Sequence, residues 1–163
     1  MTADDVKRIL GLHPHPREGG WFVRTYVADE SVELARYGGP RFTSTAIYYL
    51  LEPDTFSEMH LLQSDEMFHH YMGGAVEMLQ LFEDGRSEVM VIGTDLEAGQ
   101  RPQVLVKRGV WQGSRLLKAE GFALLGCTVS PGFEFVDYAA MGREEMVERW
   151  LGEAERIGLL TRG

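Results

Sequence analysis

The chain between residues 44 and 138 is a succession of short runs rich in β-branched and aromatic residues, separated by turn residues at roughly ten-residue intervals. This spacing is typical of an all-β sandwich or closed barrel, in which many short strands are joined by tight turns. No ten-residue helical pattern interrupts the series, which argues against βαβ units and a parallel sheet. The runs predict strands over residues 44–51, 56–61, 66–72, 76–82, 87–92, 103–106, 112–117, 122–129 and 133–138.

Helices and one further strand are expected outside this series. A threonine at the N-cap position, two aspartates in the first turn and a closing glycine predict a short helix over residues 2–11. The run 21–27 predicts a strand, and the polar stretch 30–40 a loop. Apolar residues at three- and four-residue spacing predict an amphipathic helix over 143–160 that docks on the outside of the β core.

Length and charge restrict the class of protein. With 163 residues the chain is expected to form one domain over 1–163, with an N-terminal helix within 1–12, a barrel core over 18–140 and a C-terminal helix over 143–160. Sixteen Lys and Arg against 25 Asp and Glu argue against nucleic acid or a membrane as partner and leave a small molecule. Because Cys127 is the only cysteine and no secretory signal or membrane span is apparent, we expect a cytoplasmic protein.

Three of the five histidines lie in the stretch HLLQSDEMFHH, which carries most of the chemistry. If strands 56–61 and 66–72 pair as a hairpin, side-chain alternation directs His60 to one face and Glu66 and His70 to another, and the two faces are expected to meet inside the barrel. An imidazole facing a carboxylate can bind a metal, act as an acid–base pair or orient a polar ligand. A purely structural His–Glu pair is the alternative.

Several motifs resemble the cupin superfamily. The order His60, Glu66, Gly73 is similar to the first cupin motif, and residues 107–112 are similar to the second. The chain most closely resembles an uncharacterised cupin family in five runs, taken in order: EGGWF, STAIYYLL, SDE, GQRPQ and GCTVSPGFEF. The resemblance implies an all-β double-stranded β-helix (a jelly-roll barrel) similar to that of dTDP-4-dehydrorhamnose 3,5-epimerase. It also implies a homodimer, for which the aromatics of 21–26 could supply the contact surface.

The resemblance implies an incomplete metal site. Metal-binding cupins use three histidines and one glutamate, but only His60 and Glu66 match, and the other positions hold Leu62 and Gln112. Leucine cannot bind a metal, and a glutamine carbonyl is a weak ligand for the metals that imidazole selects. No cofactor is therefore firmly predicted, and a divalent metal held by His60, Glu66 and Gln112 remains an alternative.

Other side chains are candidates for catalysis or ligand binding. One of two adjacent tyrosines should enter the barrel, and we assign Tyr49 as a proton donor opposite the His60 base, with a core-filling role as the alternative. Trp111 and Gln112, at the position of the third cupin ligand, would suit a sugar, a base or a carboxylate. Capping of the barrel is the alternative for Trp111.

Alternation favours His70 over His69 inside the pocket, whereas the resemblance favours His69, and this conflict stays open. Arg24 is a candidate for anion recognition, with a solvated or ion-paired arginine as the alternative. Glu134, between two phenylalanines, is expected near the barrel rim, with an outward-facing strand position as its alternative.

Together these features predict a cupin-type small-molecule-binding protein whose activity the sequence does not identify. The first hypothesis is a metal-independent isomerase or epimerase that acts on a sugar-like or carbonyl-bearing small molecule. In this hypothesis His60 is the base, Glu66 orients it and Tyr49 is the acid. A metal-dependent cupin enzyme and a non-catalytic module that binds or senses a small molecule are the alternatives. The sequence does not identify the ligand.

Overall fold

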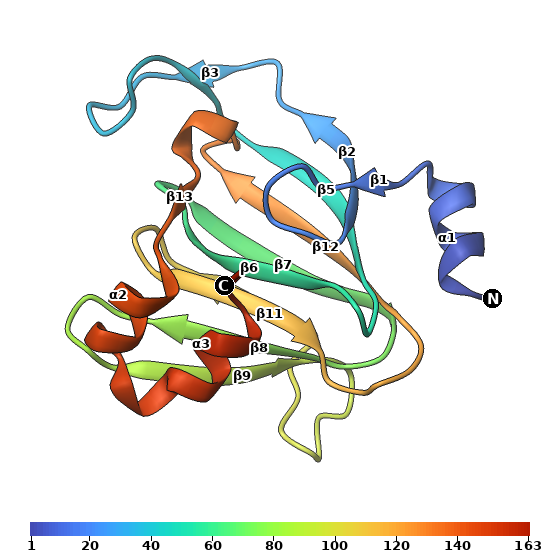
Figure 1. Ribbon diagram of the computed structural model, residues 1–163. Coiled ribbons are helices and arrows are strands. Elements are labelled where there is room, and N and C mark those ends of the chain that lie inside the picture. The colour runs from blue at the N-terminus through green and yellow to red at the C-terminus, as the bar shows by residue number, and fades with distance from the viewer.

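Two antiparallel sheets pack face to face and form a barrel, which Figure 1 shows for residues 1–163 of the computed structural model. The first sheet has the strand order β1-β2-β5-β12-β7-β10, the second has the order β13-β6-β11-β8-β9, and β3 pairs with β4. The strands are β1 (His13–Pro14), β2 (Trp21–Val27), β3 (Ser31–Val32), β4 (Arg41–Phe42), β5 (Thr45–Leu51), β6 (Phe56–Leu61), β7 (Asp65–Gly73), β8 (Val76–Leu81), β9 (Ser87–Ile92), β10 (Gln103–Val106), β11 (Trp111–Leu116), β12 (Ala123–Ser130) and β13 (Ala139–Ala140).

The core lies between the two sheets, as the predicted double-stranded β-helix requires. Thirteen buried residues from both sheets form its largest apolar cluster, which includes Phe68 of β7, Met78 of β8 and Leu125 of β12. Alternating side chains from facing strands fill this space, while the opposite faces of the sheets point outward. The expected fold class is confirmed, and most of the expected strands are found within one or two residues of their predicted bounds.

The predicted hairpin between the strands that carry His60 and Glu66 is wrong. β6 pairs with β11 and β13, whereas β7 pairs with β12 and β10 in the other sheet. The connection at residues 62–64 therefore crosses from one sheet to the other. Alternation within a single strand cannot reveal its partner, and both pairings direct His60 and Glu66 into the barrel.

A bulge in β6 shapes the wall of the barrel. His60 lies opposite Gln112 and Ser57 lies opposite Ser114, so three steps along β6 match two steps along β11. The extra residue changes the alternation and allows both Ser57 and His60 to be buried.

The predicted strand over 133–138 is also wrong. The chain instead forms a short 3-10 helix, η1 (Phe135–Asp137). Pairing with β6 begins only after it, at β13. Arg41 of β4 forms two hydrogen bonds of 2.7 Å to the carboxylate of Asp137, which hold the segment in this turn.

The predicted C-terminal helix is divided into three parts: α2 (Arg143–Arg149), η2 (Leu151–Glu153) and α3 (Ala154–Leu159). Trp150 interrupts it because its backbone leaves the helical region and its buried indole donates a hydrogen bond of 3.0 Å to the Phe82 carbonyl. As expected, this segment packs on the outside of the second sheet (Figure 1).

The N-terminal helix α1 (Ala3–Leu10) forms as predicted, with Thr2 and Asp5 in a capping box. Val6 packs it against the outer face of the first sheet. The aromatics of 21–26, expected as a contact surface, differ in how they are covered. The ammonium of Lys7 lies 4.1 Å from the ring centre of Trp21, whereas Tyr26 is exposed. No helix in the structure combines the length and apolar character that a membrane span requires.

Candidate functional site

A narrow cavity opens at the end of the barrel where β5 and β7 begin and β12 ends. Its volume is about 30 Å³, which is room for about two water molecules. Only a small chemical group can therefore enter it fully. The lining residues are His15, Glu18, Phe22, Arg24, Thr45, Ile47, Leu62, Glu66, Cys127, Val129, Phe133 and Phe135.

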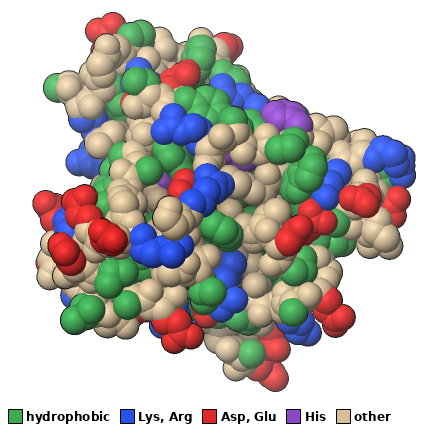
Figure 2. Space-filling view, in the orientation of Figure 1, with side chains coloured by type: hydrophobic (Ala, Val, Ile, Leu, Met, Phe, Trp, Pro, Cys, Tyr) green, Lys and Arg blue, Asp and Glu red, His purple; other side chains and the backbone are tan.

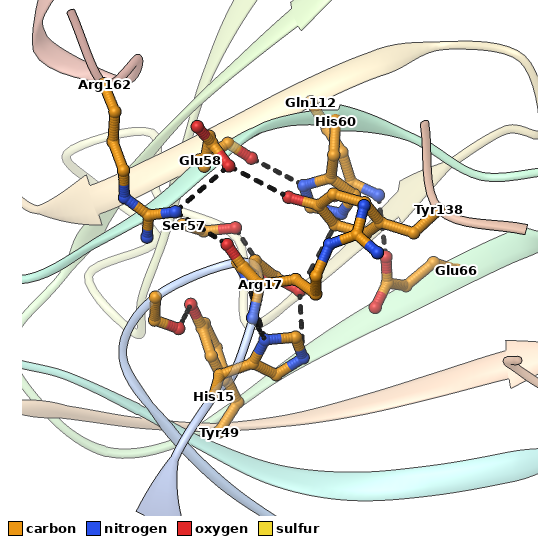
Figure 3. Close-up of polar contacts among 12 residues, drawn as sticks. His15, Arg17, Tyr49, Ser57, Glu58, His60, Glu66, Gln112, Tyr138 and Arg162 are labelled. Carbon is orange, nitrogen blue, oxygen red and sulfur yellow. Dashed lines mark hydrogen bonds and ion pairs between the residues drawn. The ribbon is translucent and has the colours of Figure 1, made fainter. Parts of the chain in front are cut away.

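Glu18 lies at the centre of the polar contacts around this cavity. Its Oε1 accepts a hydrogen bond of 2.5 Å from the Ser57 hydroxyl. Its Oε2 lies 3.7 Å from Nε2 of His15 and 3.9 Å from Nε2 of His60. Figure 3 shows the two imidazoles and Ser57 directed toward the same point. One carboxylate is thus held by three side chains from two parts of the chain.

Two glycines bring the loop that carries Glu18 close to the barrel. Gly19 and Gly20 have φ values of 98° and 69°, in the region that favours glycine. A Cβ on Gly19 would lie 2.3 Å from the Phe56 carbonyl oxygen. The Tyr49 hydroxyl donates a hydrogen bond of 2.7 Å to the Gly19 carbonyl and fixes the loop from within the barrel.

The hydrogen bonds of His15 and His60 define opposite roles for their ring nitrogens. His15 Nδ1 accepts from the backbone N–H of Glu18 at 2.8 Å, so the proton of neutral His15 is on Nε2, which faces Glu18. Burial lowers the pKa of His15 and favours this neutral form. His60 Nδ1 lies 2.6 Å from the Glu58 carbonyl, which can only accept, so Nδ1 carries a proton. Nε2 of His60 is then the nitrogen free to accept a proton.

Glu66 forms a wall of the same cavity in a different environment. It extends from β7, is 7% exposed, and its Oε2 accepts a hydrogen bond of 2.7 Å from the Gln112 amide. Burial, reinforced by the negative charge of Glu18, raises the pKa of Glu66 to about 8. These surroundings favour the protonated, neutral form of Glu66.

Aromatic and cationic groups cover His60 from the outside. The Tyr138 ring stacks on its imidazole with centres 4.9 Å apart, and the Arg17 guanidinium lies 5.0 Å from the Tyr138 ring centre. Arg162, next to the C-terminus, donates hydrogen bonds to Glu58 at 3.3 Å and to the Arg17 carbonyl at 2.8 Å (Figure 3). These contacts leave His60 only 1% exposed.

The structure places the three predicted catalytic residues differently from the hypothesis. His60 faces Glu18 and lies behind the cavity lining, and its orienting partner is the Glu58 carbonyl in place of Glu66. Tyr49 is buried with its hydroxyl bound to Gly19, and burial raises its pKa well above the ordinary value. Only Glu66 lines the cavity itself.

The predicted ligand-binding residues are divided between the cavity and other parts of the fold. Arg24 lines the cavity, and Gln112 reaches it through Glu66. Contrary to expectation, Trp111 does not share the inner face of β11 with Gln112. Adjacent strand residues point to opposite faces, so Trp111 lies on the outer face and packs against the C-terminal helices. Glu134 is half-buried beside the cavity, whereas its neighbours Phe133 and Phe135 line it.

Neither His69 nor His70 lines the cavity. His70 has the inward position that alternation favours, opposite Leu125, but it lies toward the other end of β7 and its Nε2 bonds the Gly74 carbonyl at 2.9 Å. His69 lies on the outer face of the first sheet, near Tyr71 and Gln103.

Sequence reasoning missed Glu18, His15 and Ser57. Glu18 and His15 lie in a loop that strand alternation does not describe, and Ser57 is turned inward by the bulge. The signal that could have identified the loop is HPHPREGG, in which a histidine and an acid three residues apart precede two glycines.

The donor set does not fit the metal that the cupin motifs imply. The positions of the missing histidines hold an apolar Leu62 and a Gln112 whose amide nitrogen faces Glu66. No group of three or more His, Cys, Asp or Glu side chains is arranged to hold a metal ion.

Comparison with known families agrees with this fold. The model of a family described as Cupin superfamily (DUF985) matches residues 5–141, which is most of the chain. The chain belongs to this family. The match includes both Glu18 and Glu66, the two acids of the cavity.

Relatives of this cupin extend over most of its length. An uncharacterized protein of Saccharomyces cerevisiae, YML079W, is 30% identical over 148 residues, which cover 83% of this chain and 74% of the yeast protein. The crystal structure of SO0799 from Shewanella oneidensis is 31% identical with a TM-score of 0.90 and covers 99% of this chain and 98% of its own. A hypothetical protein from Leishmania major is 27% identical with a TM-score of 0.90, and both chains are covered fully.

More distant structures share only the fold. Oxalate decarboxylase from Bacillus subtilis is 15% identical with a TM-score of 0.56, and the similarity covers 91% of this chain but 37% of the decarboxylase.

Proposed function

We propose that this cupin is a metal-independent acid–base enzyme that moves a proton on a small carbonyl-bearing molecule, as an isomerase or epimerase does. The observation that supports it is the pair of carboxyl groups, Glu18 and Glu66, in one small apolar cavity with opposite environments. Groups whose surroundings separate their pKa values are suited to act as acid and base at the same pH. Their arrangement replaces the His60, Glu66 and Tyr49 roles expected from the sequence.

Each acid has one role in this scheme. The Glu18 carboxylate removes a proton from the carbon next to the carbonyl, and Glu66 gives its proton to the carbonyl oxygen, so an enol, a neutral Glu18 and an ionised Glu66 are formed. Return of the proton from Glu18 to the same carbon, while Glu66 takes back the enol proton, restores both groups and completes the exchange. In a hydroxyketone the intermediate is an enediol: Glu18 gives its proton to the former carbonyl carbon and Glu66 takes the proton of the other hydroxyl, so the carbonyl moves to the neighbouring carbon and both groups are again restored. Ser57 donates a hydrogen bond to Glu18 and the Nε2–H of His15 faces it, so these two side chains position Glu18, and Gln112 positions Glu66.

The apolar wall of the cavity supports this assignment. Phe22, Ile47 and Leu62 surround the two carboxyl groups and limit hydration. A dry surrounding strengthens the electrostatic contacts to the developing oxyanion and keeps Glu66 neutral until it reacts.

Proton exchange into deuterated solvent tests the proposal without knowledge of the natural substrate. Neutral and anionic small ketones and hydroxyketones are incubated with the protein in D₂O, and loss of the proton signals next to the carbonyl is followed by NMR. We expect catalysed exchange that falls by about 10²- to 10⁴-fold in Glu18→Gln and in Glu66→Gln. The matched control is Glu77→Gln, which removes a carboxylate bonded to Arg115 outside the cavity.

Two results would contradict the proposal. One is exchange that is unaffected by either cavity substitution. The other is a set of ligands that raise the melting temperature yet undergo no proton exchange, which would support the binding or sensing alternative. Near-stoichiometric Fe, Mn, Ni or Zn in elemental analysis of untagged protein would support the metal-dependent alternative.

A further inference from the structure

The geometry points to a substrate class: we infer that the carbonyl compound is a small oxo acid whose carboxylate binds Arg24 while its ketone reaches Glu66. This inference rests on the proposed function. Arg24 is the one Lys or Arg side chain that lines the cavity, and it lies exposed on β2 at the mouth, whereas Glu66 is buried in the wall.

The hydrogen bonds of Arg24 leave it available to a ligand. Its Nη2 donates to the Phe133 carbonyl at 3.1 Å, which fixes the side chain over the mouth. It forms no salt bridge, although many other arginines of this acidic chain do, such as Arg41 with Asp137. A guanidinium has five N–H donors arranged to match a carboxylate, and most of these remain unused. Because Arg24 lines the cavity, these donors are available to an anion that enters from outside the protein.

The size of the cavity limits what the rest of the ligand can be. About 30 Å³ holds the reacting carbonyl and one or two neighbouring atoms, and the remainder lies in the mouth beside Arg24. The walls between the two ends are apolar and include Phe22, Ile47 and Phe133, which suit a short carbon chain. A carboxylate and a ketone separated by few carbons meet these requirements.

Charge supports the same orientation. The chain carries a net charge of −9, which repels anions, so an anionic substrate needs a local positive region. Figure 2 shows several Lys and Arg side chains near the middle of the face shown, with most of the Asp and Glu toward its margins. Within the cavity, a neutral Glu66 leaves Glu18 as the principal negative group and avoids a second carboxylate facing the anion.

The experiment compares oxo acids with their neutral amides. Pyruvate, 2-oxobutyrate and levulinate are each paired with the corresponding amide, and both exchange in D₂O and dissociation constants by NMR titration are measured for the wild type, Arg24→Gln and Arg24→Lys. Arg8→Gln is the matched control, because Arg8 is an exposed arginine of α1 outside the cavity.

We expect at least one acid to bind at least tenfold more tightly than its amide, and this preference to disappear in Arg24→Gln and to be only partly kept in Arg24→Lys. The inference is overturned if every acid and its amide behave alike in the wild type, or if Arg24→Gln leaves the preference intact. The two hypotheses fail separately. If the neutral amides exchange the protons next to their ketone in a way that depends on Glu18 but not on Arg24, only the substrate class is refuted. If the acids bind through Arg24 but undergo no exchange, only the proposed function is refuted.

Discussion

Two carboxyl groups in one small apolar cavity cannot both be ionised without a large cost in free energy. The protein meets this constraint by giving Glu18 the Ser57 hydroxyl as a hydrogen-bond donor, and Glu66 an apolar wall with a single amide partner. The consequence is a neutral acid beside a carboxylate at the same pH. In the proposed function this neutral acid is the proton donor, and its burial also affects the stability of the protein.

Glu66 makes the stability of the protein depend on pH. Its pKa rises from 4.5 to about 8 on folding, so between these values the folded state binds the proton more strongly than the unfolded state. The free energy of unfolding should fall as pH rises through this window, by on the order of 3 kcal/mol. In Glu66→Gln this fall should be largely absent. Urea unfolding at pH 5.5 and 8.5 measures the change in unfolding free energy between the two pH values. An equal change in the wild type and in Glu66→Gln would contradict the account.

Glu18 and its histidines were not found from the sequence because their meeting is a tertiary event. His15 and Glu18 are neighbours in the chain, but His60 and Ser57 reach them from β6 in the second sheet. By contrast, Glu66 and His60 were placed inside the barrel correctly, because alternation along a strand fixes the face of a side chain whatever its pairing. Alternation did not fix which inward side chains touch.

At the scale of elements, the loop between β1 and β2 decides the geometry of the site. It carries Glu18 into contact with β6, and its path depends on the two glycines and on the Tyr49 hydroxyl. The short strands that define the barrel were predictable from their composition and turn spacing. The turn at η1 and the division of the C-terminal helix were not, because they depend on the Arg41–Asp137 and Trp150–Phe82 contacts.

Gly19→Ala tests the role of this loop. The added Cβ would lie 2.3 Å from a backbone oxygen at a positive φ, so the loop must move and Glu18 with it. We expect a loss of about 1–3 kcal/mol in unfolding free energy and a loss of exchange activity of at least tenfold. Gly38→Ala is the control, because a Cβ there meets no atom within 4 Å and φ is not positive. Wild-type activity in Gly19→Ala would show that the loop does not position Glu18.

At the scale of the whole molecule, the C-terminal segment reaches the loop that carries Glu18. Arg162, next to the C-terminus, bonds the carbonyl of Arg17 beside Glu18 across a separation of 145 residues. The C-terminus lies near β6 in the middle of the view in Figure 1. The C-terminal segment therefore acts as a clamp on the loop that carries Glu18, in addition to covering the second sheet.

Arg162→Met removes this clamp while it keeps an apolar stem of similar length. We expect a folded protein with exchange activity reduced by roughly tenfold, through a looser Glu18. Because Glu18 also raises the pKa of Glu66, that pKa should fall in the same variant. Arg149→Met, on α2 against Trp150, is the matched control. An unchanged Glu66 pKa together with unchanged activity would refute the clamp.

The most direct test of the acid–base pair is a ¹³C NMR titration of the glutamate side-chain carboxyl groups. The account predicts one carboxyl that titrates near pH 8, is absent in Glu66→Gln and shifts to lower pH in Glu18→Gln, because the neighbouring charge has been removed. Titration of every glutamate carboxyl near pH 4 to 5 in the wild type would contradict it.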